Sequence, residues 1–116
     1  MITAVEFRRH LHRHPELSFE EVQTATYIEQ ALTEAGIPHS RIAETGVLAK
    51  IEGKGDLSRA IVLRADIDAL PIEEQTALPY ASENRGVMHA CGHDAHTAIL
   101  IATGRRLQDM KDRLNC

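Results

Sequence analysis

The segment from Met88 to His96 concentrates side chains that bind metal ions, and it reads Met-His-Ala-Cys-Gly-His-Asp-Ala-His. Thiolate, imidazole and carboxylate groups are all direct ligands of zinc and of neighbouring transition metals. Cys91 and His93 stand two residues apart, and Gly92 between them lets the backbone bend closely. In an extended or turn segment this pair binds one ion together or faces two ions. The alternative is a small buried Cys91 among histidines that serve only as polar groups.

Three aspartates extend this set of candidate residues. Asp94 follows His93 directly, and we predict that it caps the next helix or orients an imidazole. Asp66 and Asp68 end an apolar run and point to the same face if that run is a strand, because side chains alternate along a strand. Two carboxylates that close together usually need a cation or a shifted pKa. The alternative is a pair of strand-end carboxylates that caps a neighbouring turn.

A second histidine group, His10, His12 and His14, falls in a segment with helical spacing of apolar residues. A spacing of two does not bring side chains together on a helix, whereas His10 and His14 at i, i+4 share one face. No acid stands near them in the sequence. A metal-binding pair of His10 and His14 is the alternative, but we expect a solvated helix face here and assign these histidines no chemistry.

Composition and motifs exclude several other classes of function. The chain has 116 residues with 13 Lys and Arg against 17 Asp and Glu, a net charge of −4, and only two Phe, two Tyr and no Trp. This balance disfavours a nucleic-acid partner. No apolar run approaches the roughly 20 residues of a membrane helix, and no signal peptide is apparent. Two cysteines without a C-x-x-C pair favour a cytoplasmic protein, and the serine-nucleophile and phosphate-loop motifs are missing.

Apolar periodicity and turn residues predict a mixed α/β order. In that order Asp66 and Asp68 lie at the carboxyl end of a buried strand, and the Met88 to His96 segment lies where a long loop enters a helix. We expect the two groups to converge in space. The elements predicted are a helix over 4–14 ending before Pro15, a helix over 18–36 with Ser18 and Glu21 as a capping box, strands over 46–51 and 60–65, a loop over 71–92 and a helix over 95–107.

Three segments together carry a resemblance to a known family. They are Arg-Arg-His-Leu-His-Arg-His-Pro-Glu-Leu-Ser (8–18), Leu-Arg-Ala-Asp-Ile-Asp-Ala-Leu-Pro-Ile (63–72) and Gly-Val-Met-His-Ala-Cys-Gly-His-Asp (86–94). In this order and at these separations the chain resembles the N-terminal part of metal-dependent amidohydrolases. The group includes hippurate hydrolases, N-acyl-amino-acid amidohydrolases and auxin-conjugate hydrolases, and it is related to aminoacylase and to dimetal carboxypeptidases.

The resemblance implies a fold, a reaction and a set of site residues. The fold is the N-terminal part of a three-layer α/β/α zinc-peptidase-like catalytic domain with an incomplete sheet. The reaction is hydrolysis of the amide bond of N-acyl amino acids with one or two divalent ions, zinc or manganese. Cys91 and His93 match the family's metal ligands, and Asp68 matches an active-site aspartate that helps to orient a ligand. Asp66 stands where the peptidase relatives have a histidine ligand, so it is a weaker candidate.

The resemblance also predicts what residues 1–116 lack. The family's catalytic Glu-Glu pair, its later ligands and its lid and dimerisation domain have no counterpart here, and Glu73-Glu74 lies in the wrong segment to substitute. We expect a fragment that is inactive alone and that self-associates through an open sheet edge. Two alternatives are a metal-binding module without turnover, with Asp68 or His89 as third ligand, and a piece that pairs with a separately encoded remainder.

Overall fold

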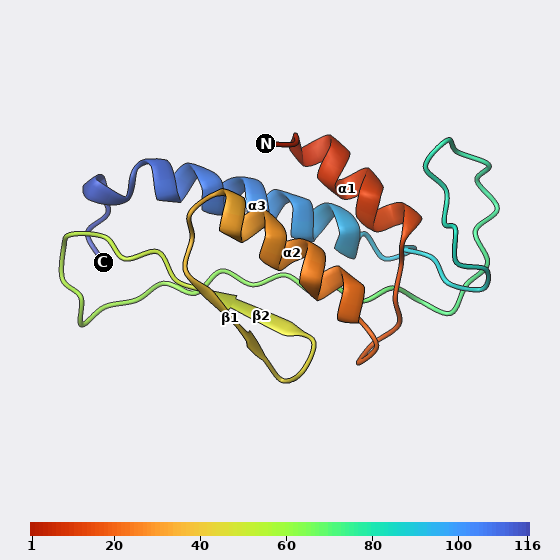
Figure 1. Cartoon of the computed structure of the whole chain (residues 1–116), viewed down its shortest axis with the longest axis horizontal. Coiled ribbons are helices and arrows are strands. Elements are labelled where there is room, and N and C mark those ends of the chain that lie inside the picture. Colours follow the sequence, from red (N-terminus) through yellow and green to blue (C-terminus); the bar gives the residue numbers. More distant parts are fainter.

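Three α-helices, one hairpin and a long extended stretch make up the computed structural model, which describes all of residues 1–116 (Figure 1). The two strands are antiparallel, with His39 opposite Ala49 and Ile42 opposite Gly46. Between the hairpin and the last helix the chain is extended or turned. The elements are α1 (Ala4–Arg13), α2 (Val22–Glu34), β1 (His39–Ile42), β2 (Gly46–Ala49), α3 (His93–Asp109) and a short 3-10 helix, Lys111–Arg113.

The core forms where α1 and α2 pack on α3. Phe7 and Leu11, one turn apart on α1, are almost fully buried, and the Phe7 ring stacks on Tyr27 of α2 with centroids 4.8 Å apart. Burial of such side chains stabilises the fold by about 1.5–3 kcal/mol each. This core therefore holds the end of α1 against the start of α3. Its buried apolar members are Phe7, Leu11, Ile28, Ala31, Leu32, Ile37, Ala98 and Ile101.

The helices were predicted well, but one cap was not. A capping box does begin α1, where Thr3 and Glu6 exchange hydrogen bonds. The box predicted at Ser18 and Glu21 is wrong, because α2 begins only at Val22 and Glu21 makes no capping bond to it. Instead the carboxylate of Glu16 accepts hydrogen bonds from the first amides of α2, Gln23 N–H at 3.1 Å and Thr24 N–H at 2.6 Å. β1 was not predicted at all.

The segment over 60–65 corrects a second prediction. It is extended, but it is not the buried central strand that its β-branched residues indicated. Ile61 and Val62 expose 78% and 82% of their surface, and no backbone–backbone hydrogen bond joins residues 60–68 to any other segment. The extended segment runs alongside the helical layer in Figure 1. β-propensity set its conformation here, and no neighbouring strand covers it.

Just beyond this segment, two single-residue pairings hold the chain in place. Ala69 N–H donates to the carbonyl of Glu16 at 2.8 Å, and Leu70 and Met88 exchange two backbone hydrogen bonds of 2.9 Å. The antiparallel pairing of Leu70 with Met88 lays the residues before 70 beside those after 88. The end of the extended segment therefore meets the start of α3.

Candidate metal site

Asp68 and His93 form the centre of the candidate site. The Nδ1 atom of His93 lies 3.0 Å from the Asp68 carbonyl oxygen and 2.9 Å from its carboxylate Oδ1. Both oxygens are acceptors, so Nδ1 carries a proton, and the neutral ring then has its lone pair on Nε2. Metal-binding histidines commonly hold their second nitrogen in this way. The predicted convergence of the two segments is confirmed at this contact.

Asp66 lies at the edge of the same site. Its carboxylate Oδ2 is 3.9 Å from His93 Nε2, while Oδ1 accepts a hydrogen bond from Arg64 at 2.6 Å. Thr97 on α3 donates its hydroxyl to the Asp66 carbonyl at 3.1 Å, which ties the extended segment to the helix. Asp66 is thus close to His93 but is half-exposed and already paired with a cation.

Cys91 completes the pair of predicted ligands. It carries a free, exposed thiol in the turn before α3, and Gly92 after it adopts φ +87°, a left-handed conformation that favours glycine. No group of three or more His, Cys, Asp or Glu side chains converges to hold a metal ion. The chain therefore presents a thiol and a free imidazole nitrogen that suit a transition metal, without a complete coordination shell.

His89 is the unusual histidine of this segment. It is 4% exposed, and neither ring nitrogen has a hydrogen-bond partner. Burial lowers the pKa of His89, although the nearby carboxylates of Asp94 and Asp68 act in the opposite direction. Burial therefore favours the neutral form of this imidazole.

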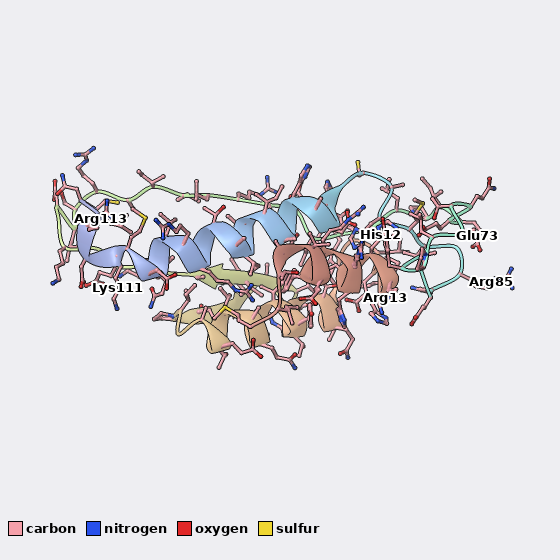
Figure 2. All side chains as sticks on the ribbon, turned by 90° about the horizontal axis from the view of Figure 1, so that it is seen from above. His12, Arg13, Glu73, Arg85, Lys111 and Arg113 are labelled. Atoms are coloured by element: carbon pink, nitrogen blue, oxygen red, sulfur yellow. The ribbon has the colours of Figure 1, made fainter.

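A buried network behind the site escaped the sequence analysis. His12 is 3% exposed, so the solvated helix face expected for it is wrong. Its Nδ1 lies 2.7 Å from Oδ2 of the fully buried Asp94, and its Nε2 lies 3.0 Å from Oε1 of Glu74. Arg8 also donates to Asp94 Oδ2, at 2.7 Å. Figure 2 shows His12 at the end of α1 that adjoins the loop carrying Glu73.

The charges in this network are set by their surroundings. Burial alone would raise the pKa of Asp94, but the hydrogen bond from His12 and the charges of Arg8 and His89 hold it below its ordinary value. Burial likewise opposes ionisation of Glu74, and hydrogen bonds from Thr76, Ser82 and His12 keep its pKa lowered. Two ionised carboxylates thus face the two nitrogens of one ring. The acid missing near the histidines in the sequence comes from segments 62 and 82 residues away.

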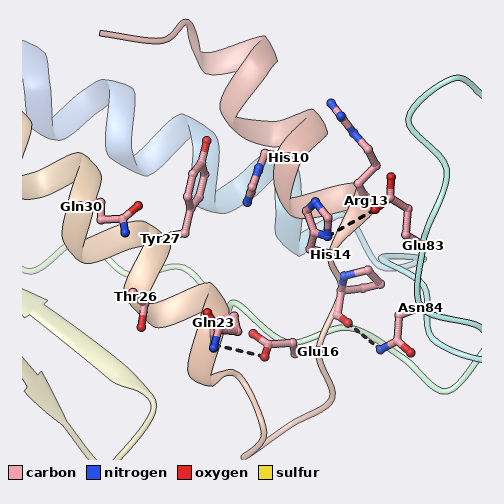
Figure 3. A pocket seen from close by; sticks show the side chains of 11 residues that line it. His10, Arg13, His14, Glu16, Gln23, Thr26, Tyr27, Gln30, Glu83 and Asn84 are labelled. Carbon is pink, nitrogen blue, oxygen red and sulfur yellow. Dashed lines mark hydrogen bonds and ion pairs between the residues drawn. The ribbon is translucent and has the colours of Figure 1, made fainter.

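A cavity of about 560 Å³ lies elsewhere, between α1, α2 and the loop around Glu83 (Figure 3). His10 stacks on Tyr27 at its edge with ring centroids 3.7 Å apart, and His14 Nδ1 lies 3.8 Å from Glu83 Oε2. Its lining is almost entirely polar. We place the candidate chemistry at Asp68, Cys91 and His93, because there a carboxylate holds one imidazole nitrogen and a free thiol stands two residues away.

The helical layer on an extended segment, with Asp68 and His93 at its end, defines an incomplete α/β domain. Residues 62–115 match the model of the peptidase family M20/M25/M40. The fold class and the family resemblance expected from the sequence are both confirmed. None of the helices has the length and apolar character needed to cross a membrane.

Similar proteins cover nearly all of this chain. It is 53% identical over 95% of its length to an N-acetyl-L-cysteine deacetylase from Bacillus subtilis. The crystal structure of the Bacillus subtilis YXEP protein, described as a dinuclear metal binding peptidase from the M20 family, aligns with 97% of the chain at a TM-score of 0.92 and 49% identity. A crystal structure from methicillin-resistant Staphylococcus aureus aligns with this chain at a TM-score of 0.87 and 44% identity. The chain spans only 26% of the deacetylase and 32% of the YXEP chain.

Proposed function

We propose that Cys91 and His93 are the metal ligands of an M20-family amidohydrolase, and that Asp68 orients His93 from within the active site. The observation that carries this proposal is the pairing of His93 Nδ1 with two oxygens of Asp68, which leaves Nε2 as the nitrogen available to an ion. The exposed thiol of Cys91 stands two residues away and suits the same ion. Zinc and manganese are the ions we expect, one or two per site.

The reaction we propose is hydrolysis of the amide bond of an N-acyl amino acid. It is supported by 53% identity to a protein named for removing the acetyl group of N-acetyl-L-cysteine. A divalent ion supplies a Lewis acid for the scissile carbonyl and lowers the pKa of water. Asp68 fixes the tautomer of His93, which keeps its Nε2 lone pair available for that ion. We further propose that residues 1–116 form the N-terminal portion of a cytoplasmic catalytic domain.

Zinc titration with a competing chelator tests the ligand assignment. We expect the chain to bind zinc with a sub-micromolar dissociation constant, and Cys91→Ser to weaken binding by at least about tenfold, because a lost ligand costs no less than a lost outer partner. Cys116→Ser is the matched control, since the second free cysteine lies outside the site. Equal affinities of the two serine variants would contradict the assignment of Cys91.

An assay with N-acetyl amino acids tests the reaction. We expect no metal-dependent turnover by residues 1–116 alone, because no group of three or more His, Cys, Asp or Glu side chains converges to hold the ion. Adding the remaining part of an M20 relative is expected to restore turnover that depends on Cys91. Turnover by residues 1–116 without such an addition would overturn the expectation. Zinc binding with no turnover under either condition would favour the alternative of a metal-binding module.

A further inference from the structure

We propose that His12 is a positioning residue for the Cys91–His93 pair, acting through Asp94. This inference rests on the proposed metal site and assigns a role to a histidine of the first helix. His12 contacts neither Cys91 nor His93 through a hydrogen bond. It acts on the residue that directly follows His93 in the chain, across 82 residues of sequence.

The first step is the connection between three segments of the chain. His12 on α1 reaches Asp94 in the first turn of α3 at 2.7 Å and Glu74 in the long loop at 3.0 Å. All three side chains are at most 4% exposed. Glu74 is held in turn by Ser82 N–H at 2.9 Å and by the Thr76 hydroxyl. One imidazole therefore joins α1, the loop and the start of α3.

The second step follows from the chemistry of the ring. Both partners are carboxylates that accept hydrogen bonds, so His12 makes both bonds only with a proton on each nitrogen. A charge-assisted hydrogen bond of 2.7 Å between buried groups fixes the Asp94 carboxylate in one place. The other oxygen of Asp94 has no side-chain or backbone partner, and Arg8 shares the oxygen that His12 uses. The position of Asp94 thus depends on α1.

The third step is geometric. Asp94 and His93 are neighbours in the first turn of α3, and Gly92 before them holds φ +87°. Cys91 leads into this turn, so its position relative to His93 depends on where α3 begins. Asp68 holds the His93 ring, and the buried His12 holds Asp94, the next residue in the chain. The two contacts together hold the first turn of α3, to which Cys91 leads.

Two substitutions remove the two hydrogen bonds of His12 one at a time. The amide nitrogen of asparagine falls near the place of Nδ1, so His12→Asn retains a donor toward Asp94 and loses the bond to Glu74. The longer glutamine places its amide near Nε2, so His12→Gln retains the bond to Glu74 and loses the donor toward Asp94. A role confined to filling space or general stability would not distinguish these two variants.

We expect His12→Gln to weaken zinc binding by about tenfold or more, and His12→Asn to stay within about threefold of the unmodified chain. The metal-free proteins provide a second readout by hydrogen–deuterium exchange. The amide of His96, which donates to the Gly92 carbonyl at 3.0 Å, should exchange faster in His12→Gln than in His12→Asn. Equal zinc affinities and equal exchange in the two variants would overturn the positioning role.

His10→Asn and His10→Gln are matched controls, because His10 lies on the same helix but stacks on Tyr27 outside the network. Neither should change zinc affinity. Glu74→Gln is a milder variant that keeps an oxygen acceptor for His12, and it should stay within about threefold of the unmodified affinity. A loss as large as that of His12→Gln would contradict the route through Asp94. A chain that binds no zinc would overturn the metal site, and the exchange comparison would then decide the positioning role by itself.

Discussion

At the scale of single residues, three histidines on one helix occupy three different environments. A helix turns about 100° per residue, so the sequence correctly separates His12 from the face shared by His10 and His14. It does not show which face is buried, because the partners of His12 lie 62 and 82 residues away. The same limit applies to His93, whose place beside Asp68 was expected from the α/β order but whose hydrogen bonds were not. Spacing within a helix predicts which side chains share a face, and packing against distant segments decides which face is buried.

His10 supports a prediction on pH. Burial lowers its pKa from 6.5, and the charges of His14 and Arg13 lower it further, while Glu83 opposes them. The unfolded chain therefore binds more protons than the folded chain as pH falls below 6.5, so the free energy of unfolding decreases there. His10→Gln removes this contribution. Urea unfolding at about pH 7.5 and about pH 5.5 should show a smaller decrease in the variant than in the unmodified chain.

A part of the decrease should remain in His10→Gln, because the pKa of the buried His89 is lowered as well. His39→Gln is the control, since His39 lies in β1 and is not among the groups that act on the pKa of His10. An equal decrease in His10→Gln and the unmodified chain would show that His10 does not contribute.

At the scale of elements, periodicity located the three helices, while their ends depended on distant groups. Ser18 and Glu21 fit the pattern of a capping box, yet Glu16 performs the capping of α2. The backbone of Glu16 also accepts Ala69 N–H, so the same residue connects α2 to the segment that carries Asp68. A short hydrophilic strand such as β1 gives no clear periodic signal, and its pairing with β2 provides the missing information.

Glu16→Ala tests this cap. We expect the free energy of unfolding to fall by about 1 to 2 kcal/mol, because the carboxylate loses two amide hydrogen bonds, a third from the Thr24 hydroxyl, and its negative charge at the helix N-terminus. Ser18→Ala, at the position that the sequence pattern favoured, should change it by less than about 0.5 kcal/mol. Denaturant unfolding of the two variants measures both values. A larger loss of stability in Ser18→Ala than in Glu16→Ala would instead support the capping box that the sequence predicted.

At the scale of the whole molecule, the fold is more open than its length requires. The radius of gyration is 15.2 Å, against about 13 Å for a packed domain of this size. The excess lies in the 48 Å long axis, along which α3 and the segment 60–68 run, and no strand pairs with that segment. Sequence reasoning identified this segment as a strand because Ile, Val and Leu favour extended structure. Its burial was predicted on the assumption of neighbouring strands, and residues 1–116 supply none.

The open segment leads to a prediction of self-association. Ile61, Val62 and Leu63 are 78%, 82% and 52% exposed, and their backbone groups pair with no other strand. An unpaired apolar edge of this kind pairs readily with another copy. Sedimentation of the purified chain should therefore show a mass that rises with concentration, and Val62→Lys should shift the distribution toward monomer. Val5→Lys, at an exposed apolar position of α1, should not do so. A monomer at every concentration, with one cooperative thermal transition, would show that the helical layer alone stabilises the extended segment.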